Sequence, residues 1–124
     1  MKQHTSSFIQ LVEEAKTHIK ETNVDAVRHR QLEGEHICLI DVREDREWVS
    51  GHLPGAIHLG KGVIERDIEQ IIADKKSEII LYCGGGYRSA LAALSLKKMG
   101  YTQVVSMDGG FHGWAERDFP IERN

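Results

Sequence analysis

Short apolar runs alternate with amphipathic stretches along most of the chain. Two of these runs, at residues 37–40 and 79–82, are continuous, which is typical of strands buried on both faces of a parallel sheet. Two further segments, at 56–59 and 103–107, predict two more strands, and residues 19–22 predict a short edge strand. Strands that alternate with helices predict an α/β domain with a mostly parallel sheet.

Apolar residues spaced three or four positions apart predict the helices that connect these strands. The predicted helices span residues 7–18, 24–33, 44–50, 64–74, 89–98 and 111–116. Asn23 is a plausible N-cap for the second of them. Lys97, Lys98 and Gly100 are the stop signals expected at the end of the helix that begins at Ser89.

Composition limits the class of partner. A chain of 124 residues with 40% hydrophobic and 28% charged residues is large enough for one soluble domain with a single core. A net charge of -3 disfavours nucleic acid or an anionic membrane as the main partner. No apolar run reaches the roughly 18 residues of a membrane span, and the start lacks the apolar middle of a signal peptide. We therefore expect a cytoplasmic location, with no membrane or nucleic-acid partner, and we predict no particular oligomeric state.

Cysteine and histidine usage argues against disulfides and metals. The two cysteines, Cys38 and Cys83, are too few for a disulfide scaffold. The seven histidines are scattered, and none are paired at the spacings of a zinc site. We expect neither a metal nor a cofactor. Cys38 lies inside an apolar run, which favours core packing over reactivity.

The glycine-rich stretch after residues 79–82 carries the strongest chemical signal. The apolar run ends at Cys83, three glycines follow, and a helix is predicted to begin at Ser89. Consecutive glycines let a backbone turn its N–H groups inward, and a helix N-terminus favours an anion. Ligands of parallel sheets bind at the carboxyl ends of the strands. The candidate catalytic residue is Cys83, and the candidate binding residues are Gly84, Gly85, Gly86, Tyr87, Arg88 and Ser89.

These features predict an amide-lined cup around the Cys83 thiol. The alternative is an inert buried cysteine followed by a tight turn, which we disfavour because a turn rarely needs three glycines. Helix N-termini and nearby cations stabilise thiolates, and both are available here. A thiolate in such a cup can attack a sulfane sulfur, a disulfide, a phosphate ester or an arsenate.

The charged residues near this cup have two interpretations each. Arg88 either binds an anionic substrate or serves as an ion-pair partner within the loop, and its planar fork favours the first role. Asp41 and Arg43 follow another predicted strand, where they brace loops or, alternatively, act in catalysis. Trp114 is expected to be structural, although residues 109–114 could form one wall of the pocket.

Together these motifs resemble the rhodanese-like (sulfurtransferase) family. The resemblance covers about residues 19–123, in the order and spacing of the family. The matching segments are residues 41–44, 47, 51–56, 82–89, 100–101, 109–114 and 120. The resemblance implies a five-stranded, mainly parallel sheet flanked by helices on both faces. It places a rhodanese-like domain at residues 19–124, after a helical extension at residues 1–18.

The resemblance also implies a sulfurtransferase. Cys83 would take a sulfane sulfur from a donor such as thiosulfate, becoming a persulfide whose outer sulfur is held by the N–H groups of residues 84–88. A thiophilic acceptor, such as cyanide, a small thiol or a thiol protein, would then remove that sulfur. Some thiosulfate-using members carry a cation directly after the cysteine. Here the loop cation is Arg88, the sixth position when Cys83 is counted as the first. The donor therefore stays open.

Two other functions fit parts of the pattern. Cysteine phosphatases and arsenate reductases of related fold place five residues between cysteine and arginine, but only four separate Cys83 from Arg88. The smaller cup suits a single sulfur atom better than a tetrahedral oxyanion. A non-catalytic, partner-binding rhodanese-like module is the third possibility. Such modules often lose the cysteine, and this chain keeps it.

Overall fold

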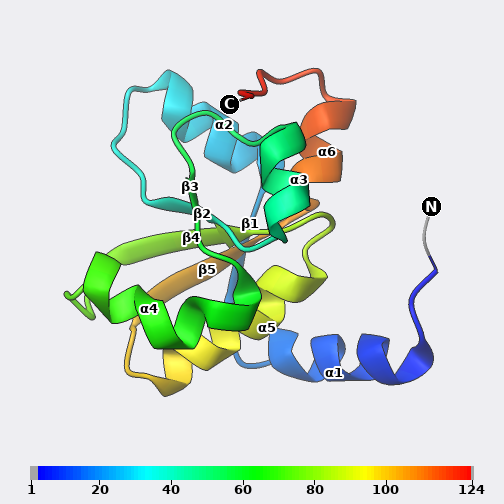
Figure 1. Ribbon diagram of the computed structural model, residues 1–124, viewed down its shortest axis with the longest axis vertical. Coiled ribbons are helices and arrows are strands. Elements are labelled where there is room, and N and C mark those ends of the chain that lie inside the picture. The colour runs from blue at the N-terminus through cyan, green and yellow to red at the C-terminus, as the bar shows by residue number, and fades with distance from the viewer. Residues whose placement is uncertain (1–2, 124) are drawn as a thin grey trace.

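A five-stranded sheet lies between two layers of helices in the computed structural model, which describes residues 3–123 (Figure 1). The strands are β1 (Lys20–Asn23), β2 (Leu39–Asp41), β3 (Ile57–His58), β4 (Glu78–Tyr82) and β5 (Gln103–Asp108). Their order is β1-β5-β4-β2-β3, and every neighbouring pair is parallel. The predicted α/β fold with a parallel sheet is confirmed, including the edge position of the first strand.

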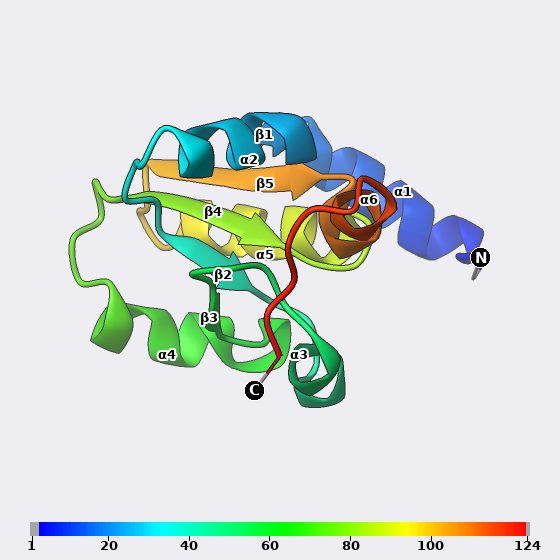
Figure 2. The ribbon, with the colours of Figure 1, turned by 90° about the horizontal axis from the view of Figure 1, so that it is seen from above.

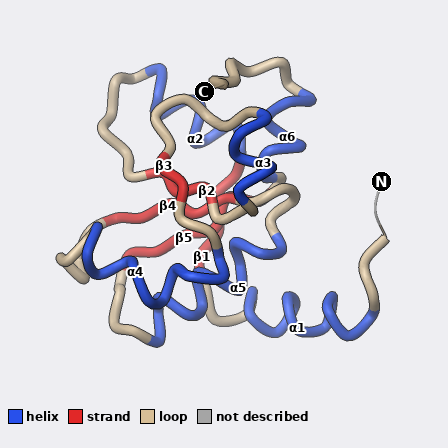
Figure 3. Tube along the Cα trace, in the orientation of Figure 1, coloured by secondary structure: helices blue, strands red, loops and turns tan. Residues whose placement is uncertain are grey.

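Helices cover both faces of the sheet. They are α1 (Ser6–Lys16), α2 (Val24–Leu32), α3 (Asp45–Ser50), α4 (Ile64–Ile71), α5 (Tyr87–Lys98) and α6 (Gly110–Glu116), with a 3-10 turn η1 (Lys61–Val63) before α4. Helices α4 and α5 cover one face, and α1 packs against the outer side of α5. Helices α2 and α6 cover the opposite face, so the sheet is enclosed (Figures 2 and 3).

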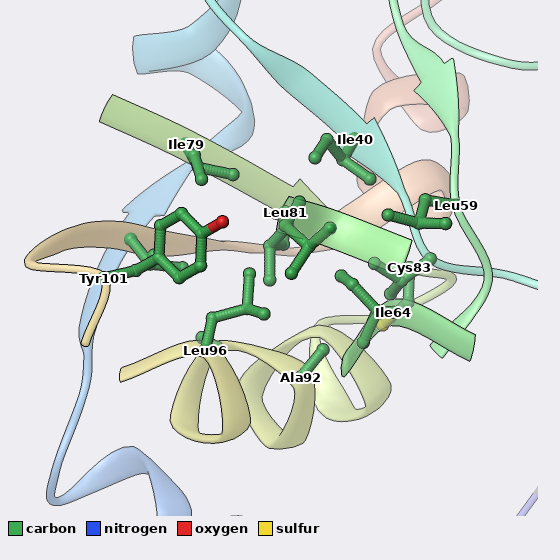
Figure 4. Packing of buried hydrophobic residues seen from close by; sticks show 13 residues of the cluster. Ile40, Leu59, Ile64, Ile79, Leu81, Cys83, Ala92, Leu96 and Tyr101 are labelled. Atoms are coloured by element: carbon green, nitrogen blue, oxygen red, sulfur yellow. The ribbon is translucent and has the colours of Figure 1, made fainter. Parts of the chain in front are cut away.

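Each face of the sheet has its own apolar core. Leu81 of β4 packs toward α4 and α5 in a cluster that includes Leu96 and the side chain of Cys83 (Figure 4). Ile80, the preceding residue, belongs to the other cluster, together with Trp114 of α6. Successive side chains of a strand point to opposite faces, so the continuous apolar run of β4 is required by two cores at once.

The strand register brings the functional segments together. Asp41 at the end of β2 pairs with Tyr82 at the end of β4, so the residues that follow both strands emerge side by side. Asp108 ends the neighbouring strand β5 at the same edge of the sheet. Within residues 3–123, no helix is long and apolar enough to cross a lipid bilayer.

Three predicted helix boundaries are wrong by more than a residue. The first helix, expected to reach residue 18, ends at Lys16, with Thr17 as its C-cap. The helix expected to reach residue 74 ends at Ile71, because the backbone of Ile72 is already extended. The helix expected from Ser89 begins two residues earlier, at Tyr87. Gly86 precedes it with φ of 100°, a left-handed conformation that suits glycine and lets the chain enter the helix at once. Arg88 therefore belongs to the first turn of α5 rather than to a loop.

Candidate active site

The sulfur of Cys83 lies at the N-terminus of α5. It accepts hydrogen bonds from the backbone N–H groups of Gly86, at 3.2 Å, and Ser89, at 3.3 Å. The Ser89 hydroxyl oxygen lies 3.4 Å from the sulfur, where it can accept from the thiol or donate to a thiolate. The residue is 1% exposed. Backbone N–H groups, a hydroxyl and a helix N-terminus together stabilise negative charge on this sulfur.

The backbone between residues 84 and 88 has further N–H groups that are not used in hydrogen bonds in the described part of the chain. Within residues 3–123, the N–H groups of Gly84 and Gly85 find no acceptor, and neither do those of Tyr87 and Arg88. A ring of unpaired N–H groups beside a thiol is an anion-binding arrangement. These groups are available to an oxyanion or to a second sulfur atom attached to Cys83.

Ser106 supports the cup from the neighbouring strand. This residue of β5 is fully buried, and its hydroxyl oxygen lies 2.7 Å from that of Ser89. Ser106 is a site residue that the sequence interpretation missed. The available signal was a serine within an otherwise apolar strand, since a buried hydroxyl needs a hydrogen-bond partner.

Arg88 is held by a carboxylate on another helix. Its guanidinium donates to both carboxylate oxygens of Glu47 in α3, at 2.7 and 3.1 Å. These hydrogen bonds lower the pKa of Glu47 to about 2. The pKa of Arg88 is raised, first by Glu47, with a smaller contribution from negative charge on Cys83. Arg88 thus has an ion-pair partner, as one of its two interpretations requires, but that partner lies in α3 rather than in the loop.

Asp41 and Arg43 form a buried ion pair beside the cup. The Arg43 guanidinium donates to Asp41 at 2.8 and 3.1 Å, and to the backbone oxygen of Gly51 at 2.6 Å. It also lies over the ring of Phe111, 4.2 Å from the ring centre. Neither side chain hydrogen-bonds to Cys83. The contacts of Arg43 join the end of β2 to the loop after α3 and to α6, which fits a structural role for this ion pair.

The start of α6 clamps the loop from the opposite side. The N–H groups of Phe111 and His112 donate to the carbonyl oxygens of Cys83 and Gly84, at 2.8 and 2.9 Å. A Cβ added to Gly110, whose φ is 55°, would lie 2.5 Å from the Cys83 oxygen. Residues 110–112 are therefore the part of the expected wall that contacts the loop.

Trp114 lies behind this contact and not in the pocket. Its side chain is fully buried in the core under α6, and its indole N–H donates to the Pro120 carbonyl at 2.8 Å. The residue can support the site only by anchoring α6. Another residue of α6, His112, comes much nearer: a Cβ added to Gly84 would lie 3.2 Å from its Nε2 and 3.0 Å from Nη2 of Arg88.

The N-terminal helix reaches the loop through Tyr87. The Tyr87 ring meets the ring of Phe8 edge-on, with centres 6.0 Å apart, and that of His4 at 4.7 Å. The ammonium of Lys16 lies 5.6 Å from the Tyr87 ring centre. Aromatic contacts between distant segments leave no periodic signal, so the sequence alone does not connect residues 4–16 with the site.

Cys38 has a different environment. It is half-buried at the edge of the core between the sheet and α4 and α5, and this burial raises the pKa of its thiol. A raised pKa reduces the thiolate fraction and hence the reactivity. Within residues 3–123, no cluster of three or more histidine, cysteine, aspartate or glutamate side chains is arranged to hold a metal ion.

Comparison with protein families and curated sequences gives consistent matches. A family described as the rhodanese-like domain matches residues 12–117. A sulfurtransferase of Allochromatium vinosum is 29% identical over 103 residues, covering 83% of this chain and 94% of that protein. A Bacillus subtilis protein provisionally named as the sulfur carrier YrkF is 30% identical over 77% of this chain. That match spans about half of the relative, 51% of its length.

Solved structures share the fold over most of the chain. A Rhodopseudomonas palustris protein of unknown function, described as a possible tyrosine phosphatase, superimposes with a TM-score of 0.83 at 29% identity, covering 98% of this chain and 99% of that one. A rhodanese-like domain protein of Staphylococcus aureus gives a TM-score of 0.76 at 27% identity, with 86% and 99% covered.

Proposed function

We propose, because this chain belongs to the rhodanese-like domain family, that it transfers sulfane sulfur through a persulfide on Cys83. One observation carries the proposal. The sulfur accepts from two backbone N–H groups, while four more between Gly84 and Arg88 have no acceptor within the described chain. The first two stabilise the attacking thiolate, and the remaining four can hold an outer sulfur.

The reaction has two half-steps. The Cys83 thiolate attacks the outer sulfur of a donor such as thiosulfate; the S–S bond of the donor breaks, and sulfite leaves with the electron pair. Cyanide, a small thiol or a protein thiol then attacks the outer sulfur of the persulfide. The new bond takes the sulfur away, and the electron pair of the broken S–S bond restores the Cys83 thiolate.

The surrounding residues receive distinct roles in this proposal. Ser89 lies where its hydroxyl can donate to the thiolate, and Ser106 orients that hydroxyl. Arg88 places positive charge beside the loop and attracts anionic donors. Asp41 and Arg43 are positioning residues that fix the neighbouring segments. Trp114 positions α6, which in turn clamps the loop.

The same proposal covers domain organisation and location. We assign residues 19–124 to the catalytic domain and residues 1–18 to an added helical segment. A free thiol must stay reduced to accept sulfur, and the cytoplasm keeps thiols reduced. We therefore propose a cytoplasmic enzyme whose partners are sulfur donors and acceptors.

A phosphatase is the second candidate, favoured by the similarity to the Rhodopseudomonas palustris protein. A cysteine phosphatase uses the loop arginine to hold a phosphate. Here the arginine is tied to Glu47, and only four residues separate it from Cys83. Hydrolysis of p-nitrophenyl phosphate that depends on Cys83 and outpaces sulfur transfer would make this the better assignment.

The experiment that tests sulfur transfer is thiocyanate formation from thiosulfate and cyanide. We expect Cys83→Ser to abolish activity while the melting temperature stays close to that of the parent protein. Cys38→Ser is the matched control, because it removes the other thiol, and it should remain active. Full activity in Cys83→Ser would refute the proposal.

A further inference from the structure

A groove of about 710 Å³ opens beside the proposed sulfur-transfer loop. It runs between α1, the first turns of α5, the segment that follows β2, and the turn η1. Its apolar part consists of Phe8, Val42, Val63 and Leu91, and Arg88 also lines it. Leu91 is one helical turn from Arg88, so both occupy the same side of α5. The groove therefore extends to the first turn of α5, which directly follows the reacting loop.

Phe8 brings the N-terminal helix into this groove. The helix is fixed at its other end by Lys16, whose ammonium lies 3.5 Å from Glu21 and 3.7 Å from Asp108. The contact of Phe8 with Tyr87 fixes it near the loop. The rhodanese-like family match begins at residue 12, so Phe8 lies outside the segment shared with the family. The apolar lining therefore combines one residue of the N-terminal extension, Phe8, with residues of the matched segment such as Leu91.

One basic side chain at the groove, that of Lys61, has no carboxylate partner within residues 3–123. Four of its residues are basic and two, Glu44 and Asp45, are acidic. Three of the basic side chains have carboxylate partners: Arg43 contacts Asp41, Arg46 contacts Glu44, and Arg88 contacts Glu47. Lys61 is half-buried and makes no ion pair with any residue in 3–123. An unpaired ammonium on such a residue favours an anionic group of a ligand.

The size of the groove indicates an organic ligand. Pockets of about 300–1,000 Å³ enclose drug-sized molecules, whereas thiosulfate has only five heavy atoms and no apolar surface. Resting on the proposed function, we infer that the groove binds the organic part of a carboxylate-bearing persulfide. Phe8 and Leu91 contact its carbon skeleton, and Lys61 binds its carboxylate. The sulfur-bearing end then lies at the loop.

The transfer from such a donor is balanced without another reactant. The Cys83 thiolate attacks the outer sulfur of the persulfide, R–S–SH. A new S–S bond forms to Cys83, the S–S bond of the donor breaks, and its electron pair leaves on the thiolate R–S⁻. The proton stays with the transferred sulfur, which gives a Cys83 persulfide and a free organic thiol.

The test compares three donors on the full chain. Glutathione persulfide carries two carboxylates, its diethyl ester has the same skeleton without them, and thiosulfate has no skeleton. The measured quantity is kcat/KM for the loading of sulfur onto Cys83, which is monitored by mass spectrometry. We expect glutathione persulfide to exceed both other donors by about tenfold or more, the change expected for one charge-assisted hydrogen bond.

Variants separate the contributions of charge and apolar contact. Lys61→Gln should remove the preference for glutathione persulfide over its ester. Phe8→Ala should lower kcat/KM of both organic donors about tenfold relative to thiosulfate. Leu11→Ala is the matched control, because this α1 side chain is 56% exposed and lies outside the groove; it should keep the parent ratios. Thermal melting checks that each variant is folded.

The outcomes distinguish this inference from the proposed function. If thiosulfate loads Cys83 but the organic donors are no better, or if the ratios are unchanged in both groove variants, the groove inference is wrong and sulfur transfer stands. If none of the three donors loads Cys83, the proposed function fails and the inference fails with it.

Discussion

Glu47 and Arg88 join α3 to the first turn of α5 through two hydrogen bonds, although they lie 41 positions apart in sequence. Glu47 also accepts from the backbone N–H of Glu44, which completes a capping box at the start of α3. One carboxylate thus caps a helix and fixes the guanidinium of Arg88. The position of Arg88 depends on a residue of another element as much as on its own helix.

This ion pair predicts a pH-dependent stability. The pKa of Glu47 falls from its ordinary 4.5 to about 2, chiefly through the hydrogen bond from Arg88. A carboxylate with a lowered pKa stabilises the folded state above about pH 4.5, and the contribution is lost as the pH falls toward 2. We expect Glu47→Gln to lower the free energy of unfolding by about 1 kcal/mol at pH 7, a value reduced for partial solvent exposure.

Urea unfolding at several pH values measures this effect. The difference between parent and Glu47→Gln should shrink as the pH is lowered from 4.5 to 2. Glu13→Gln is the control, because Glu13 is exposed and makes no ion pair within residues 3–123. A Glu47→Gln difference that is independent of pH would contradict the assigned coupling.

Substitution of Arg88 is expected to weaken the reaction with anionic donors selectively. Arg88→Ala should raise KM for thiosulfate and lower kcat/KM by about tenfold or more, because a charge-assisted contact is lost. Arg88→Lys should recover part of the loss, since it keeps the charge but not the planar fork. Steady-state kinetics with varied thiosulfate provide the measurement. An unchanged kcat/KM in Arg88→Ala would limit Arg88 to its structural pairing with Glu47.

The hydroxyl of Ser106 is expected to influence the sulfur of Cys83 indirectly, through the hydroxyl of Ser89. Ser106→Ala removes the partner of the Ser89 hydroxyl, which is then free to rotate away from Cys83. We expect a loss of about 1 kcal/mol of stability and a several-fold slower alkylation of Cys83 by iodoacetamide at neutral pH. Ser95→Ala, a half-buried serine further along α5, is the control. Equal alkylation rates in all three proteins would remove Ser106 from the site.

The backbone at Gly110 has no room for a side chain, which is the strictest requirement near the loop. In Gly110→Ala the new Cβ would meet the Cys83 and Gly84 carbonyl oxygens at 2.5 and 2.6 Å, at a φ of 55°. We expect at least about 2 kcal/mol of destabilisation together with loss of sulfur transfer, because α6 must move off the loop. Gly62→Ala is the control, since its Cβ would have no atom within 4 Å and its φ is not positive. A stable, active Gly110→Ala would contradict the clamp.

The fold was predictable because its signals are local. The apolar run of β4 and the stop signals of α5 depend only on neighbouring residues, and both elements lie close to where the sequence places them. Asn23 caps α2 as predicted, accepting from Ala26 at 2.8 Å. The start of α5 was wrong because it depends on the backbone conformation of Gly86, and a run of three glycines does not show which one adopts a positive φ.

The candidate site was only partly predictable, because its supporting contacts are long-range. The position of Cys83 after a buried strand follows from sequence. The partners Glu47, Ser106 and Phe8 come from three other elements, and only tertiary packing brings them together. Trp114 lies within a matching motif, and its side chain is in the core, as its expected structural role requires. A motif identifies a segment but not the direction of each side chain.

Whether Cys83 carries sulfur is tested by the intact mass of the protein after incubation with thiosulfate. We expect a gain of one sulfur atom, which cyanide removes as thiocyanate, and which is retained in Cys38→Ser but absent in Cys83→Ser. No mass gain in the parent protein with any sulfane donor, or a gain that persists in Cys83→Ser, would contradict this expectation.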